Sequence, residues 1–119
     1  MLAFDSITRQ NYFLAAYRPI LTPEQIGPTI ELIESFDGRY TELRNARARI
    51  LEEASDHLDV ATMLINNRVE VLELSRLVRR TIFRDILTRE QRLQHKQMVE
   101  ENRARRRKLK EQNATGNPG

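Results

Sequence analysis

The hexapeptide Ile-Leu-Thr-x-Glu-Gln occurs twice, at residues 20–25 and 86–91, and marks two points at which helices begin. In each copy a Thr precedes a Gln by three residues, which is the spacing of a capping box. The Thr hydroxyl can accept a hydrogen bond from the backbone N–H of the Gln, while the Gln side chain can accept one from the N–H of the Thr. We therefore predict helix starts at Thr22 and Thr88.

The residues around the two threonines favour the first helix start more than the second. Pro23 supports the first start because its ring presets a helical φ and its missing N–H would have lacked a partner anyway. Leu21 and Leu87 stand just before the caps, where an apolar side chain can pack onto the first turn. Ile26 is placed to receive Leu21, whereas Arg92 occupies the equivalent position in the second copy. We expect the second apolar contact to be weaker.

The two motifs, which end at Gln25 and Gln91, give the chain a resemblance to a known family. Over roughly residues 20 to 100 it resembles the LTXXQ-motif family of periplasmic Spy/CpxP-type stress chaperones and related metal-resistance sensor proteins. The resemblance implies a thin, curved, all-helical dimer that holds unfolded polypeptides on a concave face without ATP. It also implies the periplasm, with the cytoplasm as the alternative because residues 1–5 do not read as a signal peptide.

Length and composition predict one small all-α domain. The chain has 119 residues, of which 31% are charged and 6% aromatic, so its core must be thin. No window alternates with the period of a strand. We predict an elongated hairpin of two long helices, with a short N-terminal helix and a C-terminal helix, in a dimeric cradle. Residues 1–112 are expected to form the domain and residues 113–119 a disordered tail.

Caps and proline positions predict the first two helices. The first begins at Asp5 or Ser6 and ends near Tyr17, because the residue before Pro19 avoids the helical region. The second begins at the first motif. Its Gly-Pro pair at residues 27–28 is expected to kink or break the first turn, because an internal proline removes a backbone hydrogen bond.

The second helix carries an apolar stripe that Arg47 interrupts and along which Gly38 marks a possible bend. Arg47 is interpreted either as a long side chain that reaches out of a groove or as a charge within a binding surface, and we favour the first. The stripe comprises Ile30, Ile33, Phe36, Tyr40, Leu43, Ile50 and Ala54.

Residues 55–59 are interpreted as the hairpin turn, with Asp59 as the cap of a third helix that runs to about Asp85. A continuous helix through Asp56 is the alternative. One stripe of the third helix comprises Val60, Leu64, Val71, Leu74, Val78, Ile82 and Ile86. A second stripe beside it comprises Ile65, Val69 and Leu72. Such a wide apolar arc must be covered by the fourth helix, a second copy of the chain or an unfolded client.

Arginines accompany this apolar surface. Cations beside excess apolar surface would suit unfolded, locally acidic polypeptides, although several will pair with nearby carboxylates. The candidate client-binding residues are Arg47, Arg76, Arg79, Arg80 and Arg84. We expect a homodimer, because one self-complementary patch serves both chains.

The sequence contains no recognisable catalytic constellation. The absence of Cys excludes disulfides, thiol catalysis and thiolate metal sites. There is no phosphate-binding glycine loop, nucleophile elbow or pair of histidines at metal spacing. His57 and His95 are interpreted as surface histidines. We expect no enzyme activity, cofactor or metal, and a metal-responsive sensor domain is the alternative function.

The positive charge of the chain is concentrated in its C-terminal part. From Thr88 onward there are nine Lys or Arg and four Asp or Glu, compared with eleven and thirteen before it. The basic run at residues 103–110 raises a nucleic-acid-binding adaptor as a further alternative. No aromatic residue lies within it for base stacking, so we favour a solvated basic helix end with weak attraction to acidic clients or membrane surfaces.

Overall fold

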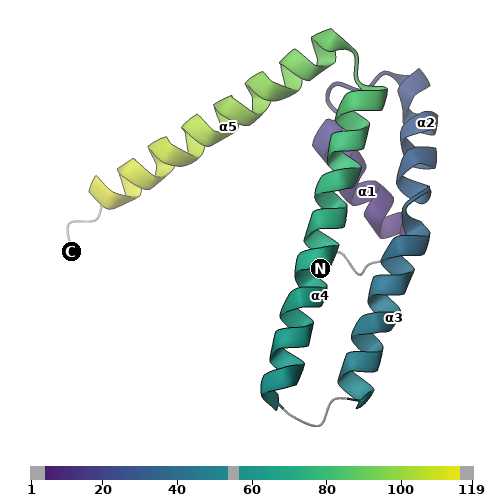
Figure 1. Cartoon of the computed structure of the whole chain (residues 1–119). Helices are drawn as coiled ribbons and strands as arrows, with labels where there is room; N and C mark the ends of the chain where they lie inside the picture. The colour runs from purple at the N-terminus through teal and green to yellow at the C-terminus, as the bar shows by residue number, and fades with distance from the viewer. Residues whose placement is uncertain (1–4, 54–56, 116–119) are drawn as a thin grey trace. The chain divides into compact units, whose positions relative to one another are not determined.

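The computed structural model describes residues 5–53 and 57–115, and the elements within these ranges are helices joined by short turns (Figure 1). The predicted all-α class is confirmed. The chain divides into two compact units, of which the first ends at Ile86 and the second begins at Leu87. The division falls immediately before the second motif's Leu-Thr pair.

Helix α1, Ser6–Tyr17, has the predicted bounds. Asp5 is its N-cap, and its carboxylate Oδ1 accepts a hydrogen bond from the Thr8 N–H at 2.8 Å. This bond, together with a side-chain hydrogen bond from Thr8, lowers the pKa of Asp5 because it stabilises the charged form. The cap therefore begins α1 as the sequence indicates.

The predicted second helix is two helices, α2 at Pro23–Glu34 and α3 at Asp37–Glu53. A kink or a break was expected at residues 27–28, and the helix does not break there, because Pro28 lies inside α2. The carbonyl that loses its partner to this proline is that of Glu24, one turn earlier, and both residues are exposed, so water can bind it.

The chain breaks instead at Ser35 and Phe36, just before Asp37. The Asp37 carboxylate is held by α1, where it accepts from the Ser6 hydroxyl at 2.6 Å and from Arg9 at 3.0 Å. A carboxylate in a first helical turn is also favoured by the helix dipole. These contacts fix the start of α3 at Asp37. Gly38, where a bend was predicted, is the next residue.

Helix α4, His57–Thr81, runs antiparallel beside α3 (Figure 1). Asn67 donates from Nδ2 to the Leu43 carbonyl at 3.0 Å, and the hydroxyls of Tyr40 and Ser75 are 2.8 Å apart. The predicted hairpin is therefore present.

The predicted turn and cap between the two long helices are only partly described. Asp59 lies inside the first turn of α4, so its predicted role as a cap is wrong. Residues 54–56, which include Ala54 of the apolar stripe and most of the proposed turn, lie outside the described residues.

A π-helix, η1 at Ile82–Ile86, follows α4 directly. The core of the first unit lies at this end, where Phe13, Ile33, Val78 and Ile82 are fully buried. In α3, by contrast, no residue after Leu43 is buried. The hairpin therefore has a packed end against α1 and α2 and a thin end with little interior.

The second unit contains helix α5, Arg89–Thr115. Its predicted start at Thr88 is confirmed by the capping bonds described below. Residues 113–115 belong to the helix, where a disordered tail was expected, and residues 116–119 lie outside the described part of the chain. Among the described helices, none is both long enough and apolar enough to cross a membrane.

Candidate functional site

The first motif forms the predicted capping box and also reaches a second part of the chain. The side-chain carbonyl Oε1 of Gln25 accepts from the Thr22 N–H at 3.0 Å, within a reciprocal capping box. The same amide donates from Nε2 to the carbonyl of Ile86 at 2.9 Å. Leu21 and Ile26 line one small cavity, which is consistent with the predicted apolar contact.

The second motif forms the same box at the start of α5. The Thr88 N–H donates to Gln91 Oε1 at 2.9 Å, and the Gln91 N–H donates to Thr88 Oγ1 at 3.2 Å. Arg92 donates from Nε to the Leu87 carbonyl at 3.3 Å. A hydrogen bond thus stands where the first copy has an apolar contact. The motif residues shape the fold and carry no reactive group.

A buried polar network joins three helices of the first unit and was not foreseen from the sequence. The buried guanidinium of Arg9 pairs with Asp37 at 3.0 Å and lies 4.6 Å from the centre of the Tyr40 ring. The hydroxyl of Tyr40 forms a hydrogen bond with the hydroxyl of Ser75 on α4, and the Ser75 hydroxyl also bonds the Val71 carbonyl. The contacts from Arg9 to Asp37 and from Tyr40 to Ser75 join residues 28 and 35 positions apart, so no local pattern could have linked these helices.

The candidate binding surface is an exposed apolar stripe along α4, formed by Leu58, Ile65, Val69 and Leu72. Their exposed fractions are 75%, 62%, 45% and 40%. Spacings of seven, four and three residues place them on one side of the helix. The buried residues Asn67, Ser75 and Val78 lie elsewhere on α4. The predicted second stripe of the third helix is therefore exposed to solvent.

Two of the candidate arginines continue the apolar stripe. Arg76 and Arg80 are exposed and follow Leu72 by one and two turns. Because Leu72 and Arg76 share a face, a dimer contact around Leu72 and a client face around Arg76 would occupy the same surface. One surface would have to serve both.

The other three candidate arginines are placed differently. Arg79 donates to the Tyr12 hydroxyl and lies 5.4 Å from the centre of that ring, so it helps to hold α1 on α4. Arg84 pairs with the adjacent Asp85 at 2.8 Å. Arg47 is exposed on α3. The structure therefore brings only Arg76 and Arg80 into line with the apolar stripe.

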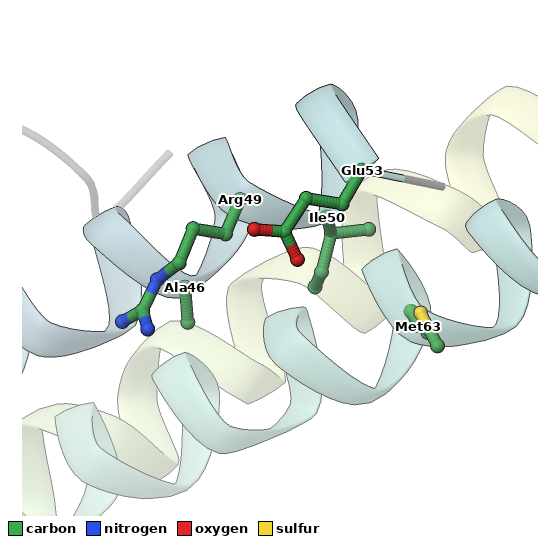
Figure 2. Close-up of a pocket in the computed structure, with 5 residues that line it drawn as sticks. All are labelled: Ala46, Arg49, Ile50, Glu53 and Met63. Carbon is green, nitrogen blue, oxygen red and sulfur yellow. The ribbon is translucent and has the colours of Figure 1, made fainter. Parts of the chain in front are cut away.

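A shallow hollow of about 560 Å³ lies between the last turns of α3 and the first turns of α4. Ala46, Ile50 and Met63 supply apolar walls, while Arg49 and Glu53 stand at the side of α3 (Figure 2). Figure 2 shows the Arg49 guanidinium directed away from the Glu53 carboxylate. This hollow could not be predicted from the sequence, since it depends on the spacing between two helices.

No metal centre is found in the part of the chain that the structure describes, where no three His, Cys, Asp or Glu side chains converge. His57 is exposed at the start of α4. His95 on α5 is half-buried, and burial lowers its pKa because it disfavours the charged imidazolium.

Comparisons of the chain with protein-family models, with curated proteins and with solved structures find no match.

Proposed function

We propose that this chain binds unfolded polypeptides without ATP, as a chaperone or stress-regulatory adaptor of the cell envelope. The observation that carries the proposal is the apolar stripe of α4, whose four large side chains are 40% to 75% exposed. Contiguous exposed apolar surface on a soluble protein commonly marks an interaction site. The duplicated motif supports the same function and a periplasmic location through its resemblance to the Spy/CpxP-type proteins.

The dimensions of the apolar stripe suit an extended peptide. From Leu58 to Leu72 the helix rises about 21 Å, at about 1.5 Å per residue. An extended chain advances about 3.3 Å per residue, so a segment of about six residues spans the stripe. Alternate side chains of that segment can contact the stripe while the remainder stays in water. Any short apolar segment satisfies this requirement, which favours broad client range over sequence specificity.

Arg76 and Arg80 add a preference for clients with acidic residues beside the apolar segment. Each exposed ion pair contributes only about 0.2 to 1 kcal/mol, so the arginines select among clients while apolar contact supplies most of the affinity. Binding on an open surface of this kind needs no closing lid, and release needs no nucleotide.

A second copy of the chain is the other occupant that the apolar stripe suits. A homodimer through this face would compete with clients. Client binding should therefore weaken as a larger fraction of the chains dimerises. Leu72→Asp is expected to shift sedimentation toward monomers. A wild-type chain that stays monomeric at tens of micromolar would exclude the dimer and leave the client proposal unaffected.

Suppression of client aggregation tests the function. Ile65→Ser with Leu72→Ser should lose most of the suppression seen for the wild-type chain in light scattering. Leu93→Ser with Leu109→Ser is the matched control, since these two side chains of α5 are also exposed, at 55% and 57%. Equal suppression by both double variants and the wild type would exclude the apolar stripe as the client site.

A further inference from the structure

The cations of α5 are arranged along one face of the helix. Arg89, Lys96, Arg103 and Lys110 recur at intervals of seven residues, which is close to two helical turns. The drift of about 20° per seven residues keeps all four within one sector of the helix. Arg106 and Arg107 fall in the same sector, because they follow Arg103 by three and four residues. We call these six residues the cationic stripe.

All six side chains of the cationic stripe are exposed. Among the described residues, no ion pair joins a carboxylate to Arg103, Arg106, Arg107 or Lys110. Glu100 lies near the middle of this face and Glu111 near its end, so the face keeps a clear positive excess. From Arg89 to Lys110 the helix rises about 31 Å.

We infer that the cationic stripe docks α5 on an anionic phospholipid surface. A straight row of cations on one face can meet a flat anionic plane along its whole length. Val99 is the apolar side chain that falls within the same sector, and it is half-buried, so this face offers little apolar surface to the acyl region. Binding is therefore peripheral and electrostatic rather than insertion of an amphipathic helix. Adsorption of this kind places the polypeptide-binding first unit beside a membrane.

A nucleic-acid groove fits the same helix less well. A helix seated in the major groove has phosphates on both flanks, so it gains most from cations on several sides. On the side of α5 away from the cationic stripe, Arg105 and Lys108 are offset by the carboxylates of Glu90 and Glu101. That side would bring no positive excess to the second flank. The arrangement therefore favours a plane over a groove.

Co-sedimentation of the full chain with vesicles tests the inference. The chain should bind vesicles that contain phosphatidylglycerol, should not bind pure phosphatidylcholine, and should be released by salt. Each Lys or Arg near an anionic surface contributes about fivefold to partitioning. Arg103→Gln with Arg107→Gln should therefore lower partitioning about 25-fold.

The matched control removes two charges from outside the cationic stripe. Arg105→Gln with Lys108→Gln gives the same net charge on the same helix, and Gln is close to both residues in helix propensity. This control should lose less than about fivefold, since its charges point away from the surface. Equal losses in the two double variants, no binding to phosphatidylglycerol, or tighter binding to a DNA duplex than to these vesicles would each overturn the inference.

Discussion

The side-chain amide of Gln25 joins two points of the chain that are 61 residues apart. Its Oε1 accepts from the Thr22 N–H at the start of α2, and its Nε2 donates to the Ile86 carbonyl at the end of η1. The carbonyls at a helix end lack partners within the helix. One residue of the first motif therefore caps its own helix and satisfies the end of another, at the first residue of the second motif.

Gln25→Glu separates these two roles. Glutamate keeps an acceptor for the Thr22 N–H but cannot donate to the Ile86 carbonyl, and it sets a negative oxygen beside it. We expect the free energy of unfolding to fall by about 1 to 3 kcal/mol, as for other lost partners of part-buried groups. Gln97→Glu, an exposed change on α5, is the control in urea titrations. Equal midpoints for the two variants would show that the bond to Ile86 contributes no stability.

The threonines of the two motifs can be tested by removal of their hydroxyls. Thr22→Ala and Thr88→Ala should each lower stability by about 0.5 to 2 kcal/mol through loss of the cap. Thr→Ser at the same positions retains the acceptor oxygen and should cost less. Urea midpoints that stay at the wild-type value in both alanine variants would contradict the capping role.

Alkaline pH should destabilise the first unit through Tyr17 and Tyr40. Burial raises the pKa of both phenols, because the buried site disfavours the phenolate. Their contribution to stability is therefore fully present below the ordinary tyrosine pKa of about 10 and is lost as pH rises through the higher folded-state pKa. The urea midpoint of the wild type should therefore be lower at a pH above this range than at a pH below it. Tyr17→Phe should show a smaller fall, and an identical fall would assign the effect to other groups.

The end of α5 should be dispensable for folding. The described side chains after Lys110 are exposed, so a chain that ends there should keep its melting temperature. The helical signal should decrease only by the residues removed. A clear drop in melting temperature would show that the removed segment packs against the rest of the protein.

Features that depend on local chemistry could be predicted from the sequence. The Thr and Gln of each motif are three residues apart, and Asp5 is three residues before Thr8, so their caps follow from short-range spacing. The exposure of Ile65, Val69 and Leu72 also follows, since α4 is apolar over a wider arc than one neighbouring helix covers. These positions supply most of the candidate binding surface.

Features that depend on distant partners could not be predicted. The break before Asp37 is set by its contacts with Arg9 and Ser6 of α1. No feature of the sequence near Asp37 indicates these two partners. Pro28 was expected to disturb α2, but it lies near an exposed helix start where water can replace the lost bond. The hydrogen bond from Arg79 to the Tyr12 hydroxyl likewise forms only when α1 and α4 are packed together. The misses at Asp37 and Arg79 therefore concern contacts between helices, whereas the miss at Pro28 concerns the exposure of one helix to water.

Site-specific photocrosslinking on α4 tests the central claim most directly. A photoreactive residue at Val69 would lie within the apolar stripe, whereas one at the adjacent Glu70 would also be exposed but would point to another side of the helix. With a permanently unfolded client, we expect strong crosslinks from position 69 and few from position 70. Equal yields at the two positions, or none at position 69, would contradict the assignment of this face to unfolded polypeptides.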